Sequence, residues 1–598
     1  MNMIHKGILL SFFAVIPALP LSASEMTILH INDHHSHLSA DSGTDLILGG
    51  EKTRVRSGGF PMMVTKFKGL EARNEHVIKL HAGDAITGDL FYTLFKGQAD
   101  AALMNEVCFD AFALGNHEFD DGDAGLAAFL DFLASSDCNT AVLGANIVPE
   151  TGVSPLALQE ANDYILPHKI MTIEGEPVGI IGLDIATKTK QSSSPDETTL
   201  FLDEVATAKE QIRLLQAKGI ERLILLTHYQ YRNDLAMAAQ LSGVDVIIGG
   251  DSHSLLGNFD EVGLSSEGPY PTIVTGADGQ MVCVAQAWEY SQILGELQVS
   301  FNDEGDVTSC RGTPHLMLAD SFRRKNADGK RTELTGEARL DVIADIAAHP
   351  NLSIVEEDKQ AAYLLSSFAS QVDELKQTII GTATDDLCLE RIPGQGRSKI
   401  CDASVTAKRG SDISNLVAHA FRDMSRTGDI AIQNGGGVRM DIPKGAFSIG
   451  DAYQLLPFAN TLVELDMTGA EIRAVLEEAL DYALTPDGST GAYPYAAGLR
   501  WTIAPDKPKG ARIDNLEFKG PNDQSWSALE ETRRYKVITN DYIAGGRDGY
   551  LTFKKVAQDG RMTDTYLDYA QSFVDYVSEK GTFGKLPTDD YSTQSYGD

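Results

Sequence analysis

Short apolar runs recur through the first half of the chain, separated by polar and glycine-containing segments. They lie at residues Thr27–Ile31, Val77–Leu80, Ala111–Leu114, Ala141–Leu143, Val178–Leu183, Leu223–Leu226 and Val244–Ile248. Between them are segments with apolar residues at helical spacing, such as Asp123–Leu133 and Asp203–Lys218. This alternation predicts a layered α/β domain whose strands are buried on both faces.

A second α/β region follows a segment of helical period. Leu340–Ile380 alternates polar and apolar residues at that period and predicts a connecting helix. Beyond it, Ile430–Ile432, Leu462–Leu465 and Tyr535–Ile538 are expected strands, and Asn415–Met424 and Gly469–Ala483 are expected helices. A chain of 598 residues also exceeds what one core supports. We therefore expect a first domain at 25–340, a helical linker or hinge at 341–378 and a second domain at 379–598.

The N-terminus has the pattern of a secretory signal. Lys6 precedes the apolar run Gly7–Ile16, and small residues Ser22–Ser24 follow. The run is shorter than the about 20 residues that a membrane-spanning helix needs, and no later segment is long and apolar enough to span. Because the first cysteine is Cys108, a lipid-modified N-terminal cysteine is excluded. We expect a signal peptide at 1–24 and a periplasmic or secreted protein.

Cysteine usage and charge narrow the picture further. Six cysteines form three sequence-neighbouring pairs, Cys108 with Cys138, Cys283 with Cys310 and Cys388 with Cys401. An even number in an exported chain favours disulfides, and pairing in order is our expectation among fifteen possible connectivities. The net charge of −35 argues against a partner that is duplex nucleic acid, because such binders need a basic surface. Any phosphate must then be attracted locally.

Several of the apolar runs are followed by residues that ligate metals. The endings are Asp33-His34-His35, Gly83-Asp84, Gly115-Asn116-His117-Glu118, Thr227-His228 and Gly249-Gly250-Asp251-Ser252-His253, with Asp120 and Asn146 as lesser members. Strand ends of α/β sheets meet at one edge, so these side chains can surround two divalent ions. Asp84 is the natural bridging carboxylate, and residues two apart, such as Asp33 and His35, can face one ion.

These motifs, in this order, resemble the calcineurin-like metallophosphoesterases, specifically their 5′-nucleotidase branch. The resemblance implies a four-layer β-sandwich flanked by helices. It also implies two divalent ions, of Zn, Mn, Mg or Co, one held by Asp33, His35, Asp84 and His253 and the other by Asp84, Asn116, His228 and Asp251. In the family, metal-held water or hydroxide attacks phosphorus in line. By this resemblance His117 is the catalytic imidazole and Asp120 orients it.

One position departs from the family pattern. Asp251 stands where many members have histidine. An additional negative charge is expected to favour a harder metal and to weaken slightly the attraction for substrate phosphate.

The C-terminal half carries Asn434-Gly435-Gly436-Gly437-Val438-Arg439, Leu456-Pro457-Phe458-Ala459-Asn460 and a glycine-rich segment from Asn540 to Tyr550. Glycine runs allow close backbone approach, arginine binds phosphate, and two aromatic rings can enclose a base. Together they resemble the α/β substrate-binding domain of 5′-nucleotidases. That resemblance implies base stacking by Phe458 and Tyr542, a base-edge contact by Asn460, ribose binding by Asp548, and substrate contacts by Asn434 and Gly436. Phosphate would be bound by Arg439, with Arg391, Arg397 and Arg409 as further candidates.

Other segments, among them His81–Gly88 and Gly545–Tyr550, are similar to bacterial NAD nucleotidases. The leading hypothesis is a hydrolase that removes 5′-phosphate from nucleotides of the AMP and NMN class and cleaves the NAD pyrophosphate. Two enzymatic alternatives keep the fold: a UDP-sugar hydrolase, and a 2′,3′-cyclic nucleotide phosphodiesterase or 3′-nucleotidase. A non-catalytic nucleotide-binding protein is the alternative from another class.

Overall fold

The first of two large sheets contains ten strands. The computed structural model describes residues 24–41, 43–326, 329–458, 460–485 and 488–597. In spatial order this sheet consists of β2 (Asp45–Leu48), β3 (Glu51–Ser57), β16 (Val307–Lys325), β15 (Ile293–Phe301), β1 (Ser24–Ile31), β4 (Val77–His81), β5 (Ala111–Ala113) and β6 (Ala141–Leu143), with β17 (Arg331–Glu333) and β18 (Leu352–Ile354) paired to β16. β1, β4, β5 and β6 are parallel neighbours, so their carboxyl ends share one edge.

The second sheet packs against the first. Its order is β13 (Thr272–Thr275), β14 (Met281–Ala285), β12 (Val246–Ile248), β11 (Arg222–His228), β9 (Glu176–Asp184) and β8 (His168–Ile173), and a small pair is formed by β7 (Ile147–Pro149) and β10 (Thr199–Phe201). Ile28 and Leu80 of the first sheet share one buried cluster with Ile180 and Ile224 of the second. Side chains of these strands are buried on both faces because helices cover the outer sides.

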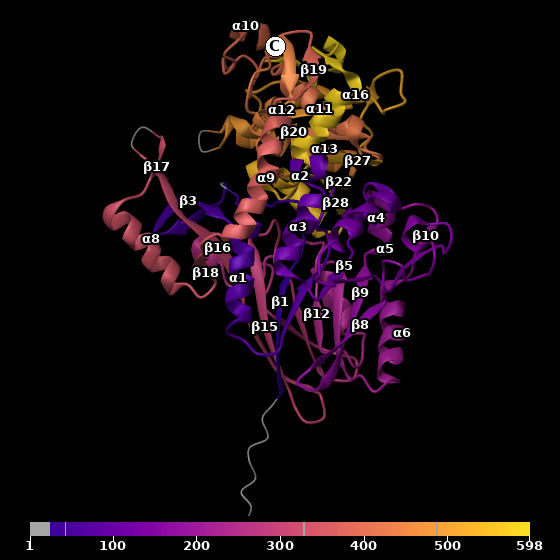
Figure 1. The fold of residues 1–598 in the computed structure, drawn as a ribbon. Coiled ribbons are helices and arrows are strands. Elements are labelled where there is room, and N and C mark those ends of the chain that lie inside the picture. The colour runs from indigo at the N-terminus through magenta and orange to yellow at the C-terminus, as the bar shows by residue number, and fades with distance from the viewer. Residues whose placement is uncertain (1–23, 42, 327–328, 459, 486–487, 598) are drawn as a thin grey trace, which may run out of the picture.

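Helices form the outer layers of this sandwich. They are α1 (Phe60–Glu71), α2 (Leu90–Phe95), α3 (Gln98–Val107), α4 (Gly122–Leu133), α5 (Ala186–Ser192), α6 (Glu204–Gln216) and α7 (Tyr231–Ala238). Phe60 and Phe67 of α1 pack on Leu29 and Ile31, while Ile212 of α6 packs with the second sheet. The four-layer α/β arrangement predicted for the first domain is present (Figure 1).

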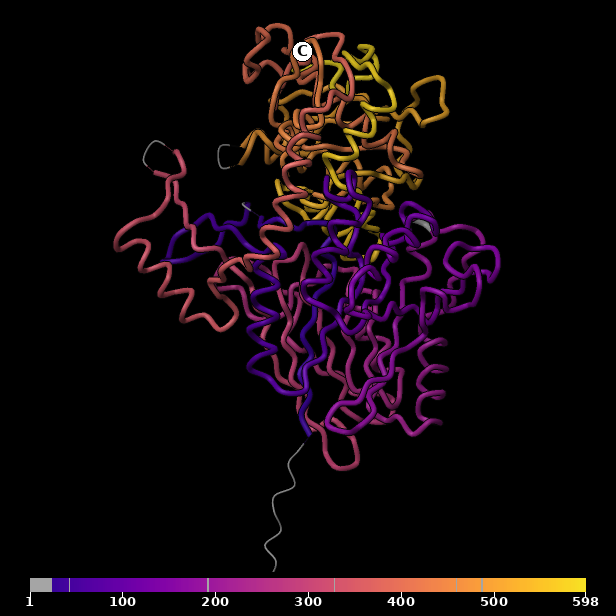
Figure 2. The backbone as a smooth tube through the Cα atoms, viewed as in Figure 1, coloured from indigo at the N-terminus to yellow at the C-terminus, as the bar shows by residue number. Residues whose placement is uncertain are grey.

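The segment after β16 leads from the N-terminal domain, the lower one in Figure 1, to the C-terminal domain above it. It contains α8 (Gly336–Ala348), β18 and α9 (Lys359–Leu375). Figure 2 shows the chain rising along α9 into the upper domain. Asp358 caps α9 by accepting hydrogen bonds from the backbone N–H groups of Gln360 and Ala361. A helix therefore lies within the predicted linker, whose boundaries at 341 and 378 remain a prediction.

The C-terminal domain holds three sheets. Their strand orders are β21 (Gly445–Ser448), β19 (Ile379–Ala383), β29 (Thr582–Phe583); β23 (Pro494–Ala497), β20 (Ile430–Asn434), β27 (Arg534–Asn540), β22 (Thr461–Thr468), β28 (Met562–Asp568); and β26 (Ser527–Ala528), β25 (Ile513–Phe518), β24 (Leu499–Ile503), β30 (Thr593–Tyr596). Its helices are α10 (Ala403–Thr406), α11 (Asp412–Met424), α12 (Ile449–Leu455), α13 (Gly469–Leu484), α14 (Asp541–Ala544), α15 (Leu551–Gln558) and α16 (Tyr569–Lys580). β28 lies at the edge of its sheet, beside the lower domain (Figure 1).

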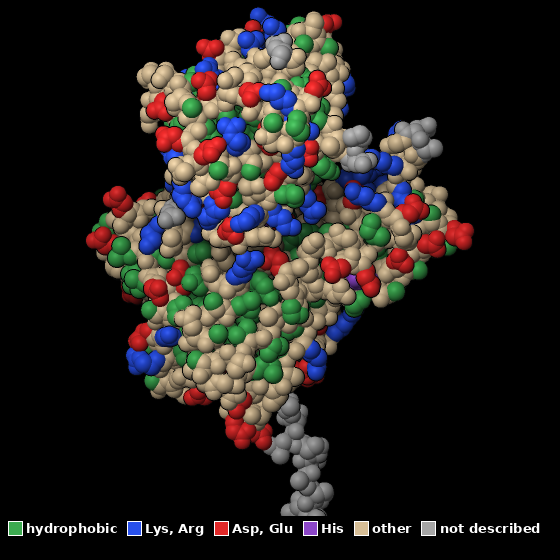
Figure 3. Space-filling model, turned by 180° about the vertical axis from the view of Figure 1, so that it is seen from behind, with side chains coloured by type: hydrophobic (Ala, Val, Ile, Leu, Met, Phe, Trp, Pro, Cys, Tyr) green, Lys and Arg blue, Asp and Glu red, His purple; other side chains and the backbone are tan. Residues whose placement is uncertain are grey.

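All six cysteines are paired in sequence order, as predicted. The disulfides join Cys108 to Cys138, Cys283 to Cys310 and Cys388 to Cys401. The predicted signal peptide, residues 1–24, falls almost entirely outside the described residues. Among the helices that the structure describes, none has both the length and the apolar character needed to cross a bilayer. Figure 3 shows Lys and Arg side chains gathered along the lower part of the C-terminal domain, next to the narrowing between the domains.

Candidate dimetal site

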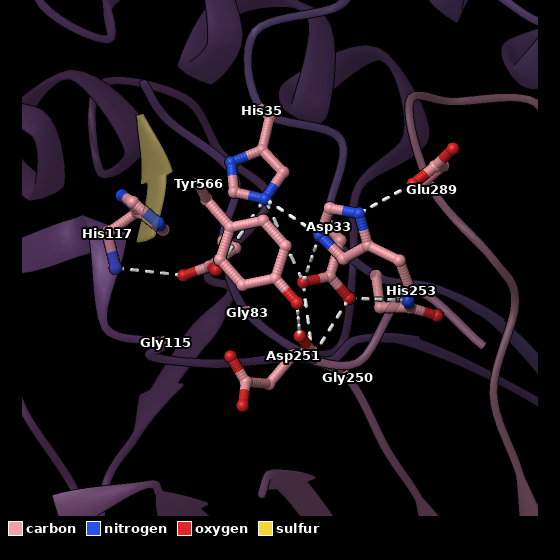
Figure 4. Close-up of polar contacts among 12 residues, drawn as sticks. Asp33, His35, Gly83, Gly115, His117, Gly250, Asp251, His253, Glu289 and Tyr566 are labelled. Carbon is pink, nitrogen blue, oxygen red and sulfur yellow. Dashed lines mark hydrogen bonds and ion pairs between the residues drawn. The ribbon is translucent and has the colours of Figure 1, made fainter. Parts of the chain in front are cut away.

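The seven predicted metal ligands converge at the carboxyl edge of the two sheets. Asp33 and His35 follow β1, Asp84 follows β4, Asn116 follows β5, His228 ends β11, and Asp251 and His253 follow β12. Each parallel strand ends at the same edge, so residues separated by more than two hundred positions in sequence meet in one place (Figure 4). All seven residues are buried or nearly so.

One group of ligand atoms lies around Asp33. His253 Nε2 is 3.3 Å from Asp33 Oδ1, and His35 Nε2 is 3.9 Å from the same oxygen. The ligand atoms of these three residues lie within 4.8 Å of one another. Such a cluster is able to hold one ion. Its three residues are three of the four ligands predicted for the first ion.

A second group lies around Asp84. His228 Nε2 is 3.0 Å from Asp84 Oδ2 and 3.6 Å from Asp251 Oδ1. Asp84 Oδ2 is also 3.6 Å from His35 Nε2. Asp84 thus approaches His35 of the first group as well as His228, as a bridging carboxylate would. Asp33 Oδ1 also lies 3.9 Å from His228 Nε2, so Asp33 is common to both groups of ligand atoms.

Several polar atoms in the cluster have no hydrogen-bond partner among the described residues. They are both polar side-chain atoms of Asn116, His117 Nε2 and Asp251 Oδ2, and all are buried. A buried polar atom without a partner is costly. Oxygen and imidazole nitrogen atoms are suitable ligands for divalent cations. The residues present therefore fit the two ions that the motifs imply.

The local backbone brings these side chains inward at strained positions. Positive φ angles occur at Asp33, His35, Asp84, Asp251 and His253, and such conformations cost about 1 kcal/mol or more each for residues with a side chain. Glycines leave room beside them: a Cβ on Gly83 would lie 2.6 Å from His228 Nδ1, and one on Gly250 would lie 2.5 Å from the Ala82 carbonyl oxygen. The Gly-Asp spacing thus has a steric reason.

Three supporting residues were not predicted from the sequence. Glu289 Oε2 lies 2.6 Å from His253 Nδ1, which leaves Nε2 free to face the cluster. Glu118 accepts hydrogen bonds from the backbone N–H groups of Asp84, Ala85, Ile86 and Gly115 and so fixes both loops. Lys188 of α5 binds the Asp251 carboxylate. Glu118 stands inside a motif, but no sequence signal links Glu289 or Lys188 to the site.

Charge and burial set the protonation of the ligands. Burial holds the pKa of His35 well below its ordinary value, so this ring is a neutral ligand. Burial opposes ionisation of Asp84, but the neighbouring His228 and His117 outweigh it and hold the pKa of that carboxyl well below its usual range. By contrast, burial opposes protonation of His228 and His253, but the neighbouring carboxylates prevail; they raise the pKa of His228 well above its ordinary value and that of His253 to about 10. Metal binding therefore requires these two rings to lose a proton.

His117 is placed beside the cluster without belonging to either ligand group. Its Nδ1 is 2.6 Å from Asp120 Oδ2, and its backbone N–H donates to Asp84 Oδ1 at 2.9 Å. Burial opposes protonation, but the charges of Asp120 and Asp84 prevail and raise the pKa of the ring. The ring is therefore oriented by Asp120, with Nε2 left open.

The predicted substrate residues lie in the C-terminal domain. Asp548 accepts hydrogen bonds from Asn434 Nδ2 at 3.0 Å and from the Tyr542 hydroxyl at 3.3 Å. The Arg439 guanidinium lies 5.5 Å from the centre of the Phe458 ring. Both rings are exposed, Phe458 at 41% and Tyr542 at 44%, so two aromatic faces are available next to a carboxylate and a guanidinium.

The other predicted substrate residues lie at separate positions in the C-terminal domain. Burial lowers the pKa of Arg391, and the nearby positive charges of Arg397 and Arg439 lower it further. The carboxylate of Asp548 acts on Arg391 in the opposite direction. Gly436 accepts a hydrogen bond from Arg439 at 3.0 Å. Arg409 lies near Tyr591, just before α11. The roles of these residues remain predictions.

Asn146 lies outside the metal cluster, and the base-edge role of Asn460 remains a prediction. Asn146 bonds the backbone of Asp184 and Leu202, so its amide ties loops together and takes no place in the cluster. Asn460 lines a small cavity with His35, Tyr290 and Tyr566, on the side of the metal cluster.

Tyr566 of β28 reaches from the C-terminal domain into the cluster. Its ring stacks on His253 at 4.4 Å between centres and on His35 at 5.7 Å. Its hydroxyl donates to the Asp251 carbonyl oxygen. In this arrangement an aromatic side chain covers the candidate ligands (Figure 4).

The fold and the cluster together define a calcineurin-like metallophosphoesterase. Residues 26–255 match the family model of the calcineurin-like phosphoesterases, and residues 380–555 match that of the 5′-nucleotidase C-terminal domain.

Curated relatives and a solved structure extend this likeness over most of the chain. The NAD 5′-nucleotidase of Haemophilus influenzae is 39% identical over 94% of this chain and 91% of its own length. The 5′-nucleotidase of Rattus norvegicus is 30% identical over 92% and 88%. The structure of Haemophilus influenzae NAD nucleotidase superimposes with a TM-score of 0.83, at 37% identity, over 96% of this chain and 99% of that one. The chain belongs to the 5′-nucleotidase family, which confirms the resemblance drawn from its motifs.

Proposed function

We propose that this protein removes 5′-phosphate from nucleotides and cleaves the pyrophosphate bond of NAD. The observation that carries the proposal is the buried cluster of Asp33, His35, Asp84, His228 and His253. The second domain adds the exposed rings of Phe458 and Tyr542 beside the carboxylate of Asp548, a group that we call the clamp. Similarity to an NAD 5′-nucleotidase over nearly the whole chain supports the choice of substrates.

The chain's own residues supply binding and proton handling. When bound, two divalent ions at the cluster would make water more acidic and neutralise charge on phosphoryl oxygens. His117 presents Nε2 toward the same space while Asp120 holds its Nδ1, so the ring donates a hydrogen bond to a phosphoryl or leaving oxygen. The burial of these groups excludes water and strengthens each contact.

The clamp in the second domain accounts for recognition of the nucleoside. Phe458 and Tyr542 offer exposed rings for base stacking, and Asp548 offers a carboxylate for ribose hydroxyls. Because Tyr566 covers the metal cluster, delivery of a bound nucleotide requires the second domain to turn relative to the first. We infer that the segment containing α9 is the hinge for this motion.

The environment and the ions are part of the proposal. Three disulfides are typical of proteins outside the cytoplasm, which agrees with a periplasmic or secreted location. Zn, Mn, Mg and Co remain the candidate ions. The mixed oxygen and nitrogen ligands favour Mn or Zn over an oxygen-only Mg site.

A substrate panel tests the proposal. The protein loaded with Mn²⁺ or Zn²⁺ is expected to release phosphate from AMP and NMN, and to convert NAD to these mononucleotides and then to nucleosides, as separated by chromatography. UDP-glucose and 2′,3′-cAMP serve as comparison substrates. Hydrolysis confined to one of these two substrates would favour the corresponding alternative hydrolase. Tight AMP binding without any release would favour a nucleotide-binding protein.

A further inference from the structure

Asp251 adds a third buried carboxylate to the candidate site. Its side chain is fully buried, and its backbone N–H donates to both carboxylate oxygens of Asp33 at 3.1 Å. Its Oδ1 is 3.6 Å from His228 Nε2, whereas Oδ2 has no hydrogen-bond partner among the described residues. A carboxylate without solvent needs compensation nearby, since the burial of an isolated charge is strongly unfavourable.

Lys188 provides that compensation from a different part of the chain. Its ammonium forms an ion pair with Asp251 Oδ1 and lies 3.8 Å from the centre of the Tyr566 ring. The residue is only 7% exposed, although lysine is seldom buried without a partner. It is carried by α5, which begins two residues after β9 ends at Asp184. The fold thus directs a cation into a site that is otherwise suited to hold cations.

We propose that Lys188 is a positioning residue that fixes Asp251 and offsets its charge at the dimetal site. The pair as a whole is neutral, so the site gains a carboxylate ligand without losing positive charge toward phosphate. The sequence alone predicts that Asp251 weakens the attraction for phosphate. The ion pair with Lys188 offsets that negative charge, so this weakening is not expected. The inference rests on the proposed function, because it assigns Asp251 to the second ion.

Opposite charge changes at the two positions test this role. Asp251→Asn and Lys188→Met each remove one charge with little change in volume. One elementary charge about 5 Å away changes binding by roughly tenfold or more at the dielectric of a partly buried site. Lys188→Met is therefore expected to strengthen Mn²⁺ binding, measured by competition with a chromophoric chelator. It is also expected to weaken inhibition by inorganic phosphate at saturating Mn²⁺.

The double variant separates the proposal from its competitors. In Asp251→Asn/Lys188→Met the two charge changes cancel, so the inhibition constant of phosphate returns to within about threefold of wild type. A double variant as insensitive to phosphate as Lys188→Met would mean that Lys188 contacts phosphate itself, and would overturn the proposal. Lower thermal stability in Lys188→Met, without opposite shifts in metal and phosphate binding, would overturn it as well.

Two further variants serve as controls. Lys188→Arg keeps the charge and is expected to behave as wild type in both measurements. Lys190→Met makes the same substitution two residues later on α5, at an exposed position, and is expected to change neither. A wild-type protein that binds no Mn²⁺ would contradict the proposed function, whereas metal binding without the predicted shifts would contradict only the role of Lys188.

Discussion

At the scale of single residues, the open nitrogen of each histidine decides what that residue is able to do. His228 Nδ1 lies 2.8 Å from the Ala82 carbonyl oxygen and His253 Nδ1 lies 2.6 Å from Glu289, so both rings offer Nε2. His117 likewise engages Nδ1, with Asp120. His228 and His253 face Asp33 and Asp84, whereas the proposed role of His117 is to contact the substrate.

Replacement of His117 separates catalysis from metal binding. His117→Ala is expected to lower kcat by roughly 10² or more, the scale for loss of an acid–base or charge-stabilising group. Metal content, measured by mass spectrometry, is expected to remain near wild type because the ring belongs to neither ligand group. Loss of the ions together with the fold would show that this role for His117 is wrong.

The residues recovered from the sequence are those whose spacing carries information. Asp33 and His35, or Asp251 and His253, lie two apart directly after an apolar run, so their convergence follows from parallel strand ends. Glu289, Lys188 and Tyr566 reach the site through long-range packing and have no comparable spacing. Asn146 also follows a strand, yet its amide is used by the backbone. A strand-end position alone therefore does not identify a ligand.

At the scale of elements, a short crosslinked loop of the second domain carries two of the proposed phosphate-binding arginines. The Cys388–Cys401 disulfide closes the segment that carries Arg391 and Arg397. Glu390 accepts hydrogen bonds from the backbone N–H groups of Gly396 and Arg397 within it. The sequence predicted the parallel strands β1, β4, β5, β6, β9, β11 and β12, and β20, β22, β27, α11 and α13 of the second domain, because their apolar periods are strong. It did not predict the antiparallel strands β15 and β16. It predicted the Cys388–Cys401 crosslink but not the fold of the loop, which also depends on the buried Glu390.

Removal of this disulfide is expected to affect substrate binding more than turnover. Closure of a loop of about 15 residues is worth roughly 3 kcal/mol in chain entropy. The Cys388→Ser/Cys401→Ser variant is therefore expected to raise the KM for AMP on the order of tenfold, with kcat little changed because the metal cluster lies in the other domain. Cys108→Ser/Cys138→Ser, in the first domain, is the matched control. An equal rise in KM in both variants would contradict a specific role for the loop.

The start of α13 gives a stability prediction with a defined pH dependence. Glu471 completes a capping box with Thr468 and binds Arg561 at 2.7 and 3.0 Å. The hydrogen bond from Arg561 lowers the pKa of Glu471 to about 2. Because the folded pKa is depressed, the stabilisation is present above the unfolded value of about 4.3 and is lost as pH falls toward 2.

Glu471→Gln is accordingly expected to lower the free energy of unfolding by about 1–2 kcal/mol at pH 7, after allowance for partial exposure. Urea denaturation at several pH values measures this difference, which should shrink steadily below about pH 4. Glu531→Gln removes an exposed partner of Arg473 at 3.7 Å and should change little at any pH. A difference between Glu471→Gln and wild type that is independent of pH would refute the ion-pair explanation.

At the scale of the whole molecule, two domains share one site. The first domain carries the candidate ligands, the second carries the proposed nucleoside clamp, and Tyr566 of the second stacks on His35 and His253 of the first. Arg426 of the second domain also donates to the Ser193 carbonyl oxygen at 3.1 Å. The relative placement of the domains could not be predicted from the sequence, because such contacts join segments hundreds of residues apart with no shared pattern.

The ring of Tyr566 has a consequence for the exchange of ions with the surroundings. The cavity lined by His35, Tyr290 and Tyr566 has a volume of about 10 Å³, which is no larger than one water molecule needs. EDTA is larger than this, so ions are expected to leave only after the domains separate. The rate of stripping should then level off as EDTA is raised, at the rate of separation. Tyr566→Ala should remove this plateau, whereas Tyr363→Ala, at a site 80% exposed on α9, should retain it. A wild-type rate proportional to EDTA throughout would show that the ring does not guard the ions. With the plateau, the same side chain that delays substrate entry would protect the protein from metal-sequestering compounds outside the cell.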